Sequence, residues 1–295
     1  MPLDEWSSPD LSGQVAVVTG ASRGVGRGIA EVLGECGATV YLVARSASSP
    51  TTPDQTGTLD EVAAAIEAAG GRAVPVQTDL GDDAAVDRLF DRVRREQGHL
   101  EVLVNNAVAW GDYGSDHDTD SKPWMMQPPW NAPRWWWESN FAVGVRSHYI
   151  VTNAAAPLFV EGRRGLVLFT SERQPDEPGM AEFVLDIRAT AVERMAFLYS
   201  LHLRPHRVSS ILLYPGFTRT ETIQRAFDRR DNIFSDWTEE EFVERTASVH
   251  YAGRAIAALA ADPAILDRTG SLLTSHDVAT AYGFTDTTGA CPDPT

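Results

Sequence analysis

Short apolar runs alternate with amphipathic stretches along most of the chain. The runs are rich in Val, Ile and Leu and are followed by Gly, Asp or Asn, as buried parallel strands are. They predict strands over residues 14–20, 39–45, 73–79, 100–107, 165–171 and 208–216, and a last segment, 271–284, that closes the sheet. Apolar residues at helical spacing predict helices over residues 26–37, 58–71, 82–98, 141–160, 186–204 and 240–262. This alternation indicates an α/β fold with a doubly wound parallel sheet.

The segment 186–204 is predicted to form a second long helix. Its spacing predicts a core-facing side formed by Ile187, Ala191, Val192, Met195 and Leu198. No internal repeat or linker interrupts the pattern. We therefore expect a single domain over residues 1–295.

Two segments break the alternation. Residues 108–138 hold six of the chain's eight Trp together with several Pro and Gly. Loops this long inside a domain are usually functional, and such an aromatic composition is not typical of disorder. We predict that this Trp-rich insertion stacks on a flat aromatic ligand, and the alternatives are a satellite core or a subunit contact. Residues 217–240 are polar and irregular, and they predict a substrate lid.

Composition and charge narrow the class of protein. The chain is 43% hydrophobic and 22% charged, as soluble globular proteins are. Its net charge of −16 argues against nucleic acid as a partner. The two cysteines form neither a metal set nor a disulfide framework, so no metal is expected. With no signal-peptide pattern and no stretch of about 18 apolar residues, we expect a cytoplasmic protein without a membrane partner.

A glycine-rich loop, TGASRGVG at residues 19–26, lies between the first predicted strand and the first predicted helix. Such glycines let the backbone approach a pyrophosphate at a helix N-terminus, although a glycine loop alone also fits a plain tight turn. Asp79-Leu80, NNA at 105–107 and PGFTRT at 215–220 follow three further strands. All these segments fall at carboxyl ends of strands, where doubly wound sheets bind ligands. The pattern therefore predicts a dinucleotide site.

The end of the second predicted strand indicates which dinucleotide binds. Folds that bind NAD place an acid there for the ribose 2′-hydroxyl. This chain has Ala44 and Arg45 instead. Arg45, with Arg23 of the glycine loop, suits a 2′-phosphate, because a guanidinium binds phosphate oxygens in pairs. The sequence therefore predicts NADP(H) as the cofactor, and a plain surface charge is the alternative role for Arg45.

Together these residues resemble the short-chain dehydrogenase/reductase family. DLSGQVAVVTGASRGVGRGIA, VNNA, AVERMAF, LRPHRV and PGFTRTE read as they do in its members, across nearly the whole chain. The closing YGFTD is similar to one bacterial branch. The resemblance implies a Rossmann-type fold of about seven strands, hydride transfer by NAD(P)H, a small-molecule substrate, and homodimers or homotetramers.

The resemblance also implies the cofactor contacts. Asp79 and Leu80 would flank the adenine, and Asn106 and Ala107 would line the ribose. The pyrophosphate would lie on the glycine loop and the nicotinamide carboxamide on PGFTRT. The residues concerned are Gly20, Ser22, Arg23, Gly24, Val25 and Gly26 in the loop, and Pro215, Gly216, Thr218 and Thr220 in PGFTRT.

The chain departs from the family at the catalytic set. Family members reduce carbonyls with Asn, Ser, Tyr and Lys: Tyr delivers the proton, Lys lowers the pKa of that Tyr, and Ser holds the substrate oxygen. Tyr and Lys stand four residues apart on one helix. Here residues 150–198 contain no tyrosine, and Lys122 is the only lysine of the chain.

Two alignments of this region with the family are possible. Anchoring GLVLFTS and ATAVERMAF puts Glu172 in the Ser position, Leu185 in the Tyr position and Ala189 in the Lys position. The helix Asn then falls on Gly144. We prefer this register because both anchors agree with it. A register one residue earlier gives Ser171, Val184 and Arg188.

Glu172 is the predicted catalytic acid–base group, with Ser171 as the second candidate. At the rim of a nicotinamide pocket, burial raises a carboxyl's pKa, so that it can donate or accept a proton. The alternative is a surface carboxylate in an acidic loop. Weaker candidates are Asp112, Tyr113, His117 and Asp186.

Three functions fit these observations. The first is an NADP(H)-dependent reductase of a bulky aromatic, conjugated or cationic (iminium) molecule, whose reduction does not require the missing Tyr. The second is a non-redox cyclase, isomerase or dehydratase that uses Glu172. The third is a nucleotide-sensing protein without catalysis. The intact phosphate loop favours the first, although a fold alone does not decide function.

Overall fold

Seven parallel strands form one sheet in the computed structural model, which describes residues 6–51, 56–108, 129–172, 183–230 and 234–293. The order across the sheet is β3-β2-β1-β4-β5-β6-β7, and every neighbouring pair is parallel. The strands are β1 (Val15–Thr19), β2 (Thr39–Ala44), β3 (Arg72–Gln77), β4 (Val102–Asn105), β5 (Gly165–Thr170), β6 (Val208–Tyr214) and β7 (Leu272–Thr274). The predicted doubly wound, Rossmann-type α/β fold is confirmed.

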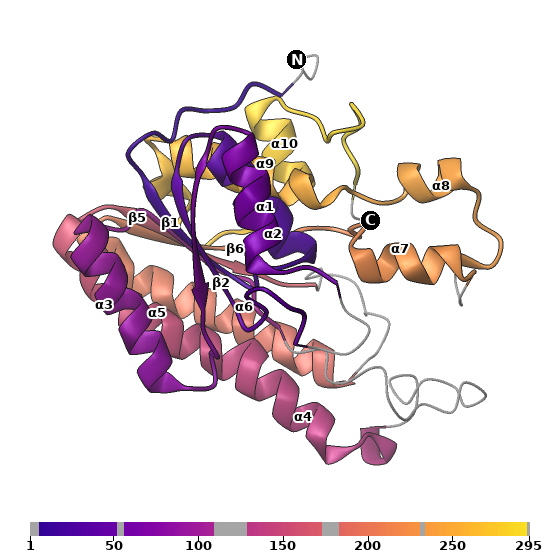
Figure 1. Ribbon diagram of the computed structural model, residues 1–295, viewed down its shortest axis with the longest axis horizontal. Coiled ribbons are helices and arrows are strands. Elements are labelled where there is room, and N and C mark those ends of the chain that lie inside the picture. The colour runs from indigo at the N-terminus through magenta and orange to yellow at the C-terminus, as the bar shows by residue number, and fades with distance from the viewer. Residues whose placement is uncertain (1–5, 52–55, 109–128, 173–182, 231–233, 294–295) are drawn as a thin grey trace.

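Two layers of helices cover the two faces of the sheet (Figure 1). Successive residues of a strand point to opposite faces, so that Val18 of β1 packs in one apolar cluster and Val17 in the other. The first layer is α1 (Gly24–Glu35), α2 (Leu59–Ala68), α9 (Val249–Ala261) and α10 (Ser275–Tyr282). The second layer is α3 (Asp83–Gln97), α5 (Ser147–Gly162) and α6 (Phe183–Leu203).

The strand order reverses at β1, which pairs with β2 on one side and β4 on the other. The chain leaves β1 for one helical layer and leaves β4 for the other. A crevice is expected at the carboxyl ends of such strands. The glycine loop follows β1 and Asn106 follows β4, so the fold brings these two predicted segments to the same edge of the sheet.

Two peripheral parts extend from this core (Figure 1). Helix α4 (Arg134–Phe141) continues through a π-helical turn, Ala142–Arg146, into α5. The predicted lid forms α7 (Glu221–Asp228) and α8 (Glu239–Glu244), which are held together by a small aromatic core. That core consists of the buried side chains Phe227, Phe234 and Phe242. No helix among the described residues is long and apolar enough to cross a membrane.

Three of the predicted elements are wrong in part. The last segment is a strand only over Leu272–Thr274, because Thr274 and Asp277 form a capping box that begins α10. The predicted helix 240–262 is two helices, α8 and α9, because the Ser248 side chain caps a new N-terminus. Helix α4 begins at Arg134, inside the segment we expected to be irregular.

The predicted core side of α6 is also wrong. Ile187 and Leu198 are 36% and 41% exposed, and of the predicted set only Val192 is fully buried. Small side chains such as Ala189, Ala196 and Ser200 face the sheet instead. Apolar residues lie on both the buried and the exposed sides of this helix, so their spacing carries little information about which side is buried.

Candidate functional site

The glycine loop turns sharply between β1 and α1. Gly20 and Gly24 have φ angles of +70° and +56°, which favour glycine. A Cβ on Gly26 would lie 2.3 Å from the carbonyl oxygen of Gly20, so only glycine lets the loop close on itself. The N–H of Gly24, the first residue of α1, donates to Glu221 Oε2 at 2.9 Å. The helix N-terminus therefore binds a carboxylate in this structure, and the same preference for anions suits it to bind a pyrophosphate.

Three arginines surround this N-terminus. Burial lowers the pKa of Arg23, the charges of Arg45 and Arg225 lower it further, and the charge of Glu221 opposes them. Arg23 and Arg45 were both predicted from the sequence, and they lie close enough to repel each other. Arg225, on the lid helix α7, was not predicted. A cluster with more cationic than anionic groups, in a chain of net charge −16, fits a phosphate-rich ligand.

The predicted adenine and ribose residues lie along the neighbouring strand ends. Leu80 and Ala107 are buried, whereas Asp79 is exposed and accepts a hydrogen bond from Gly81 N at 2.9 Å. The side chain of Asn106 donates to Thr19 O at 3.0 Å and accepts from Thr170 Oγ1 at 3.3 Å. Asn106 therefore ties the carboxyl ends of β1, β4 and β5 together, which fixes the floor of the crevice.

The remaining glycine-loop residues and the predicted nicotinamide segment also lie at this edge. In the loop, Ser22 is buried and Val25 is half-buried. Of the PGFTRT segment, Pro215 and Thr218 are buried, Thr218 Oγ1 donates to Gly216 O at 3.0 Å, and Thr220 caps α7. These contacts hold the backbone of the segment in place.

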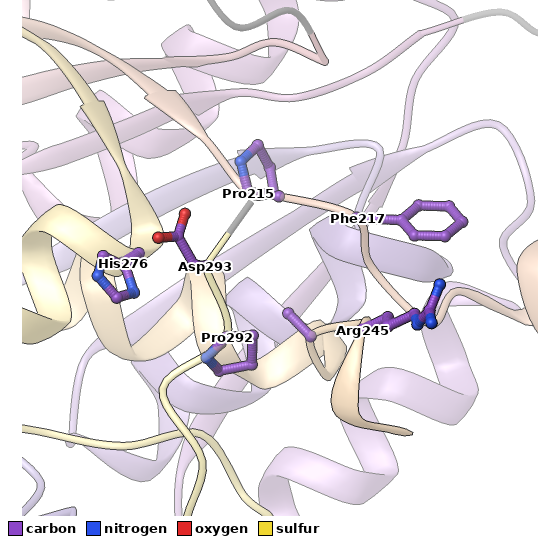
Figure 2. A pocket seen from close by; sticks show the side chains of 8 residues that line it. Pro215, Phe217, Arg245, His276, Pro292 and Asp293 are labelled. Atoms are coloured by element: carbon purple, nitrogen blue, oxygen red, sulfur yellow. The ribbon is translucent and has the colours of Figure 1, made fainter. Parts of the chain in front are cut away.

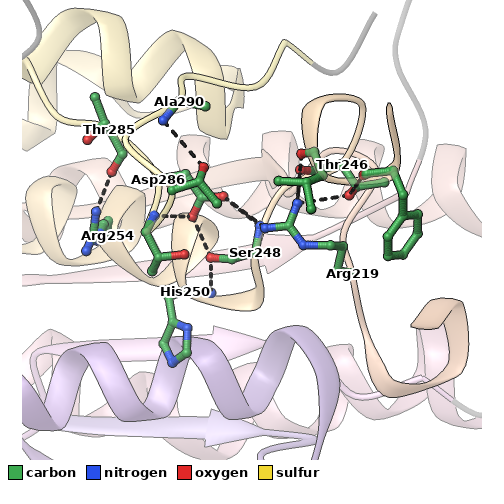
Figure 3. Close-up of polar contacts among 12 residues, drawn as sticks. Arg219, Thr246, Ser248, His250, Arg254, Thr285, Asp286 and Ala290 are labelled. Atoms are coloured by element: carbon green, nitrogen blue, oxygen red, sulfur yellow. Dashed lines mark hydrogen bonds and ion pairs between the residues drawn. The ribbon is translucent and has the colours of Figure 1, made fainter. Parts of the chain in front are cut away.

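Arg219 anchors the same segment to the C-terminal part of the chain (Figure 3). Its Nη1 donates to Val243 O at 2.9 Å and to Thr246 Oγ1 at 3.0 Å, and its Nη2 lies 3.8 Å from Asp286 Oδ2. The buried Asp286 carboxylate also accepts from the N–H of Ser248 at 2.7 Å. Asp286 belongs to the YGFTD segment, so this network joins two predicted motifs.

A small cavity borders the predicted nicotinamide segment (Figure 2). Its lining includes Pro215, Phe217, His276 and Asp293. Its volume is about 10 Å³, which is room for one water molecule at most. It is therefore too small to be the substrate site.

A buried arginine organises the carboxyl end of β5. Arg188 of α6 is 3% exposed, and its Nη1 donates to Asn140 Oδ1 at 2.7 Å. Its Nη2 forms an ion pair with Glu172 Oε1. Burial lowers the pKa of Arg188 to about 10, so the guanidinium stays charged at neutral pH. An arginine partner favours the ionised form of the Glu172 carboxyl.

Ser171 and Glu172 differ in their exposure. Ser171 is 8% exposed, and its Oγ has no hydrogen-bond partner among the residues that the structure describes. The Glu172 side chain is 41% exposed. A buried hydroxyl without a partner is costly unless a ligand or water satisfies it, so Ser171 is a candidate to bind a substrate oxygen.

The residues that the two possible alignments propose for α6 lie in the same region of the structure. Val184 and Arg188, from the earlier register, are buried, and so is Ala189 from the preferred one, whereas Leu185 is half-buried. Gly144, in the predicted Asn position, packs against the stem of Arg188. The amide at this site comes instead from Asn140, one turn earlier. Neither Asn140 nor Glu221 was singled out from the sequence, because each is recognisable only by a partner far along the chain.

Of the weaker catalytic candidates, Asp186 is half-buried, and Asp112, Tyr113 and His117 lie outside the described residues.

His148 of α5 is a further buried group that the sequence did not single out. Its Nε2–H donates to Ala107 O at 3.0 Å, and burial lowers the pKa of His148 to about 4. It is therefore a neutral residue at physiological pH.

The tryptophans in the described part of the Trp-rich insertion differ in their exposure. Trp136 is fully buried, as expected for a satellite core. Trp130, Trp135 and Trp137 are 80%, 39% and 43% exposed, and Trp137 stacks on Phe141 at 4.1 Å between ring centroids. Trp110 and Trp124 lie outside the described residues.

In the described segments, no group of three or more His, Cys, Asp or Glu is arranged to hold a metal ion.

The fold and this edge of the sheet define a dinucleotide-binding protein of the Rossmann type. The family model of the short chain dehydrogenases matches residues 14–231. Dehydrogenase/reductase SDR family member 1 of Homo sapiens is 34% identical over 287 residues, which cover 95% of this chain and 85% of that protein. A metagenomic short-chain oxidoreductase, solved in complex with NADP, has a TM-score of 0.67 at 26% identity and covers 90% of this chain and 98% of its own.

A short-chain type dehydrogenase/reductase of Picea abies is 28% identical over 212 residues, which cover 72% of this chain and 73% of that protein. This chain belongs to the short-chain dehydrogenase/reductase family, whose members are oxidoreductases.

Proposed function

We propose that this protein is an NADP(H)-dependent oxidoreductase. The tight glycine loop fits the pyrophosphate, and Arg23 and Arg45 supply cations for the 2′-phosphate. The similar metagenomic oxidoreductase was solved with NADP, which agrees with this choice. When bound, the nicotinamide supplies or accepts a hydride.

The proposal for the substrate end depends on one observation, the Arg188–Glu172 ion pair beside the buried Ser171 hydroxyl. Glu172 is the proposed acid–base group, and it is positioned by Arg188, which in turn is held by Asn140. Ser171 donates a hydrogen bond to a substrate oxygen. Because the chain lacks the Tyr–Lys pair, we do not expect it to reduce simple ketones or aldehydes, whose alkoxide product must be protonated at once.

The same pair favours one substrate class. An ionised Glu172 alone would attract an iminium cation, but its charge is balanced by the guanidinium of Arg188. The buried Ser171 hydroxyl, whose Oγ has no hydrogen-bond partner among the described residues, is instead suited to donate to a substrate oxygen, as a conjugated carbonyl compound provides. We therefore favour a bulky conjugated carbonyl compound, with an iminium compound as the second choice. The exposed Trp130, Trp135 and Trp137 offer faces on which a flat substrate can stack.

NADPH oxidation with a panel of conjugated carbonyl, iminium and simple ketone substrates tests this function. We expect turnover of the first class, and we expect Glu172→Gln to lower it by at least about 100-fold without changing NADPH affinity. Glu138→Gln, a matched change of an exposed acid on α4, should leave turnover unchanged. Product formation without NADPH oxidation would favour the non-redox enzyme, and NADPH binding without any turnover across the panel would favour the nucleotide sensor.

We also propose that the protein is a homodimer or homotetramer that associates through α5 and α6. The outward side of these helices exposes large apolar residues that a monomer would leave in water: Tyr149, Ile187, Phe197, Leu198 and Leu201. A second copy of the chain would cover this face.

A further inference from the structure

The predicted nicotinamide segment pairs with a second piece of backbone. The N–H of Arg219 donates to Ala247 O at 2.8 Å, and the N–H of Ala247 donates to Phe217 O at 2.8 Å. Thr218 and Ala247 therefore form a short parallel bridge. Because this bridge ends next to Ser248, the N-cap of α9, the position of the segment depends on where residues 246–248 are held.

One buried carboxylate holds both sides of this bridge (Figure 3). Asp286 is 1% exposed. Its Oδ2 accepts from the N–H of Ser248 at 2.7 Å, and its Oδ1 accepts from the Ser248 hydroxyl and, at 2.7 Å, from the N–H of Thr287. The same Oδ2 lies 3.8 Å from Nη2 of Arg219. Asp286 thus contacts the nicotinamide segment through Arg219 and the backbone beside it through Ser248.

The contact with Arg219 joins two largely buried charges. The Arg219 side chain is 14% exposed, and its Nη1 donates to Thr246 Oγ1 at 3.0 Å. Burial lowers the pKa of Arg219, and the negative charge of Asp286 opposes that shift. A buried cation without its anion is costly, because neither water nor a partner then offsets its lost hydration. Removal of the Asp286 carboxylate should therefore displace the guanidinium, and with it residue 219 of the segment.

The backbone that carries Asp286 is itself fixed. The N–H of Asp286 donates to Ala290 O at 2.7 Å, which closes a turn, and Nη1 of Arg254 in α9 donates to Thr285 O at 2.6 Å. Asp286 therefore holds the bridge from a defined position. The glycine loop and Arg45 depend on other contacts, because they are held by the ends of β2 and β3.

We propose that Asp286 is a positioning residue for the nicotinamide half of the cofactor. Through Arg219 and Ser248 it keeps the backbone of residues 216–219 in the place where the nicotinamide carboxamide binds. Groups that are held in place before binding bind a ligand more tightly than groups that must be ordered during binding. The adenosine half, on the glycine loop and Arg45, does not depend on Asp286. This inference rests on the cofactor site proposed above.

Calorimetric titration with two ligands tests the inference. NADPH has both halves of the cofactor, whereas adenosine 2′,5′-bisphosphate has the 2′-phosphate and no nicotinamide. We expect Asp286→Asn to weaken NADPH binding about 10-fold and to leave binding of the bisphosphate unchanged. Asp267→Asn, which changes an exposed acid between α9 and β7, should bind both ligands like the wild type.

The two ligands separate positioning from a general loss of structure. If Asp286→Asn weakened the binding of both ligands equally, or of neither, the inference would be overturned. If the wild type bound neither ligand, the proposed cofactor site itself would be wrong.

A second variant reaches the same contact without changing the buried carboxylate. Arg219→Met keeps the stem and removes the guanidinium, so NADPH should again bind about 10-fold more weakly and the bisphosphate as before. In Asp286→Asn/Arg219→Met the combined loss should be smaller than the product of the two single losses, because both variants remove one contact. Losses that multiply, or unchanged NADPH binding by Arg219→Met, would show that Asp286 does not act through Arg219 and would overturn the inference.

Discussion

Gly144 packs directly against the stem of Arg188, with no room for a side chain at position 144. Gly144 lies in the π-helical turn between α4 and α5, and a Cβ at this position would lie 2.6 Å from Cδ of Arg188. The missing side chain at position 144 makes the room that the buried arginine needs to reach Asn140 and Glu172. The alignment preferred from the sequence predicts the family's helix Asn at position 144, and the glycine found there leaves the space that the stem of Arg188 occupies.

Gly144→Ala should destabilise the fold. The added methyl group forces Arg188 out of place, which costs about 1–3 kcal/mol in the free energy of unfolding. Urea denaturation measures this. Gly162→Ala is the control, because a Cβ at the end of α5 meets no atom within 4 Å. In the double variant Gly144→Ala/Arg188→Ala the methyl group should add almost no cost, and the same cost with and without the arginine stem would contradict the steric coupling.

The strands and the cofactor edge could be predicted because their signals are local. A strand ended by glycine, as at Gly20, or a β2 end with Arg45 and no acid, needs only a few consecutive residues to be recognised. The Arg188 network needs three segments to meet: Asn140 on α4, Glu172 after β5 and Arg188 on α6. Spacing alone left the register of α6 open by one residue, and on an apolar helix it could not identify the buried side.

Cofactor preference should depend on Arg45. The wild type is expected to bind NADPH more tightly than NADH, and Arg45→Ala should weaken NADPH binding by about 1–3 kcal/mol, which is roughly 5- to 150-fold. Binding of NADH should change little, because it lacks the 2′-phosphate. Calorimetry with both cofactors measures the difference, and Arg88→Ala on α3 controls for a change in net charge. Equal affinities of the wild type for the two cofactors would contradict the assignment.

Association should depend on the outward side of α6. Leu201 is 55% exposed and lies beside Leu198 and Phe197 on the apolar face. Leu201→Asp places a charge in the proposed contact, so light scattering after gel filtration should show a smaller species than the wild-type dimer or tetramer. Val243→Asp, at a 40% exposed apolar site on α8, should leave the mass unchanged. A wild-type chain that runs as a monomer at micromolar concentration would refute the proposal.

His148 should make the fold sensitive to mild acid. It is 3% exposed, and its Nε2–H donates to the carbonyl of Ala107 at 3.0 Å, so the ring is neutral with Nδ1 unprotonated. Burial lowers the pKa of His148 from 6.5 to about 4, and the positive charge of Arg188 acts in the same direction. Within the described residues Nδ1 has no hydrogen-bond partner that would compensate a proton there.

Between pH 6.5 and about 4, the unfolded chain therefore binds a proton at His148 that the folded chain does not. The neutral His148 therefore costs the fold nothing above pH 6.5. As the pH falls from 6.5 to about 4, the free energy of unfolding decreases by about 3 kcal/mol in total because of this group. Since carboxyl groups also titrate there, the measurement is the difference between the wild type and His148→Gln in urea midpoints across this range. The wild type should lose more stability on acidification, whereas His202→Gln, at an exposed site on α6, should follow the wild type. Parallel curves for the wild type and His148→Gln would show that His148 takes up its proton without unfolding the chain.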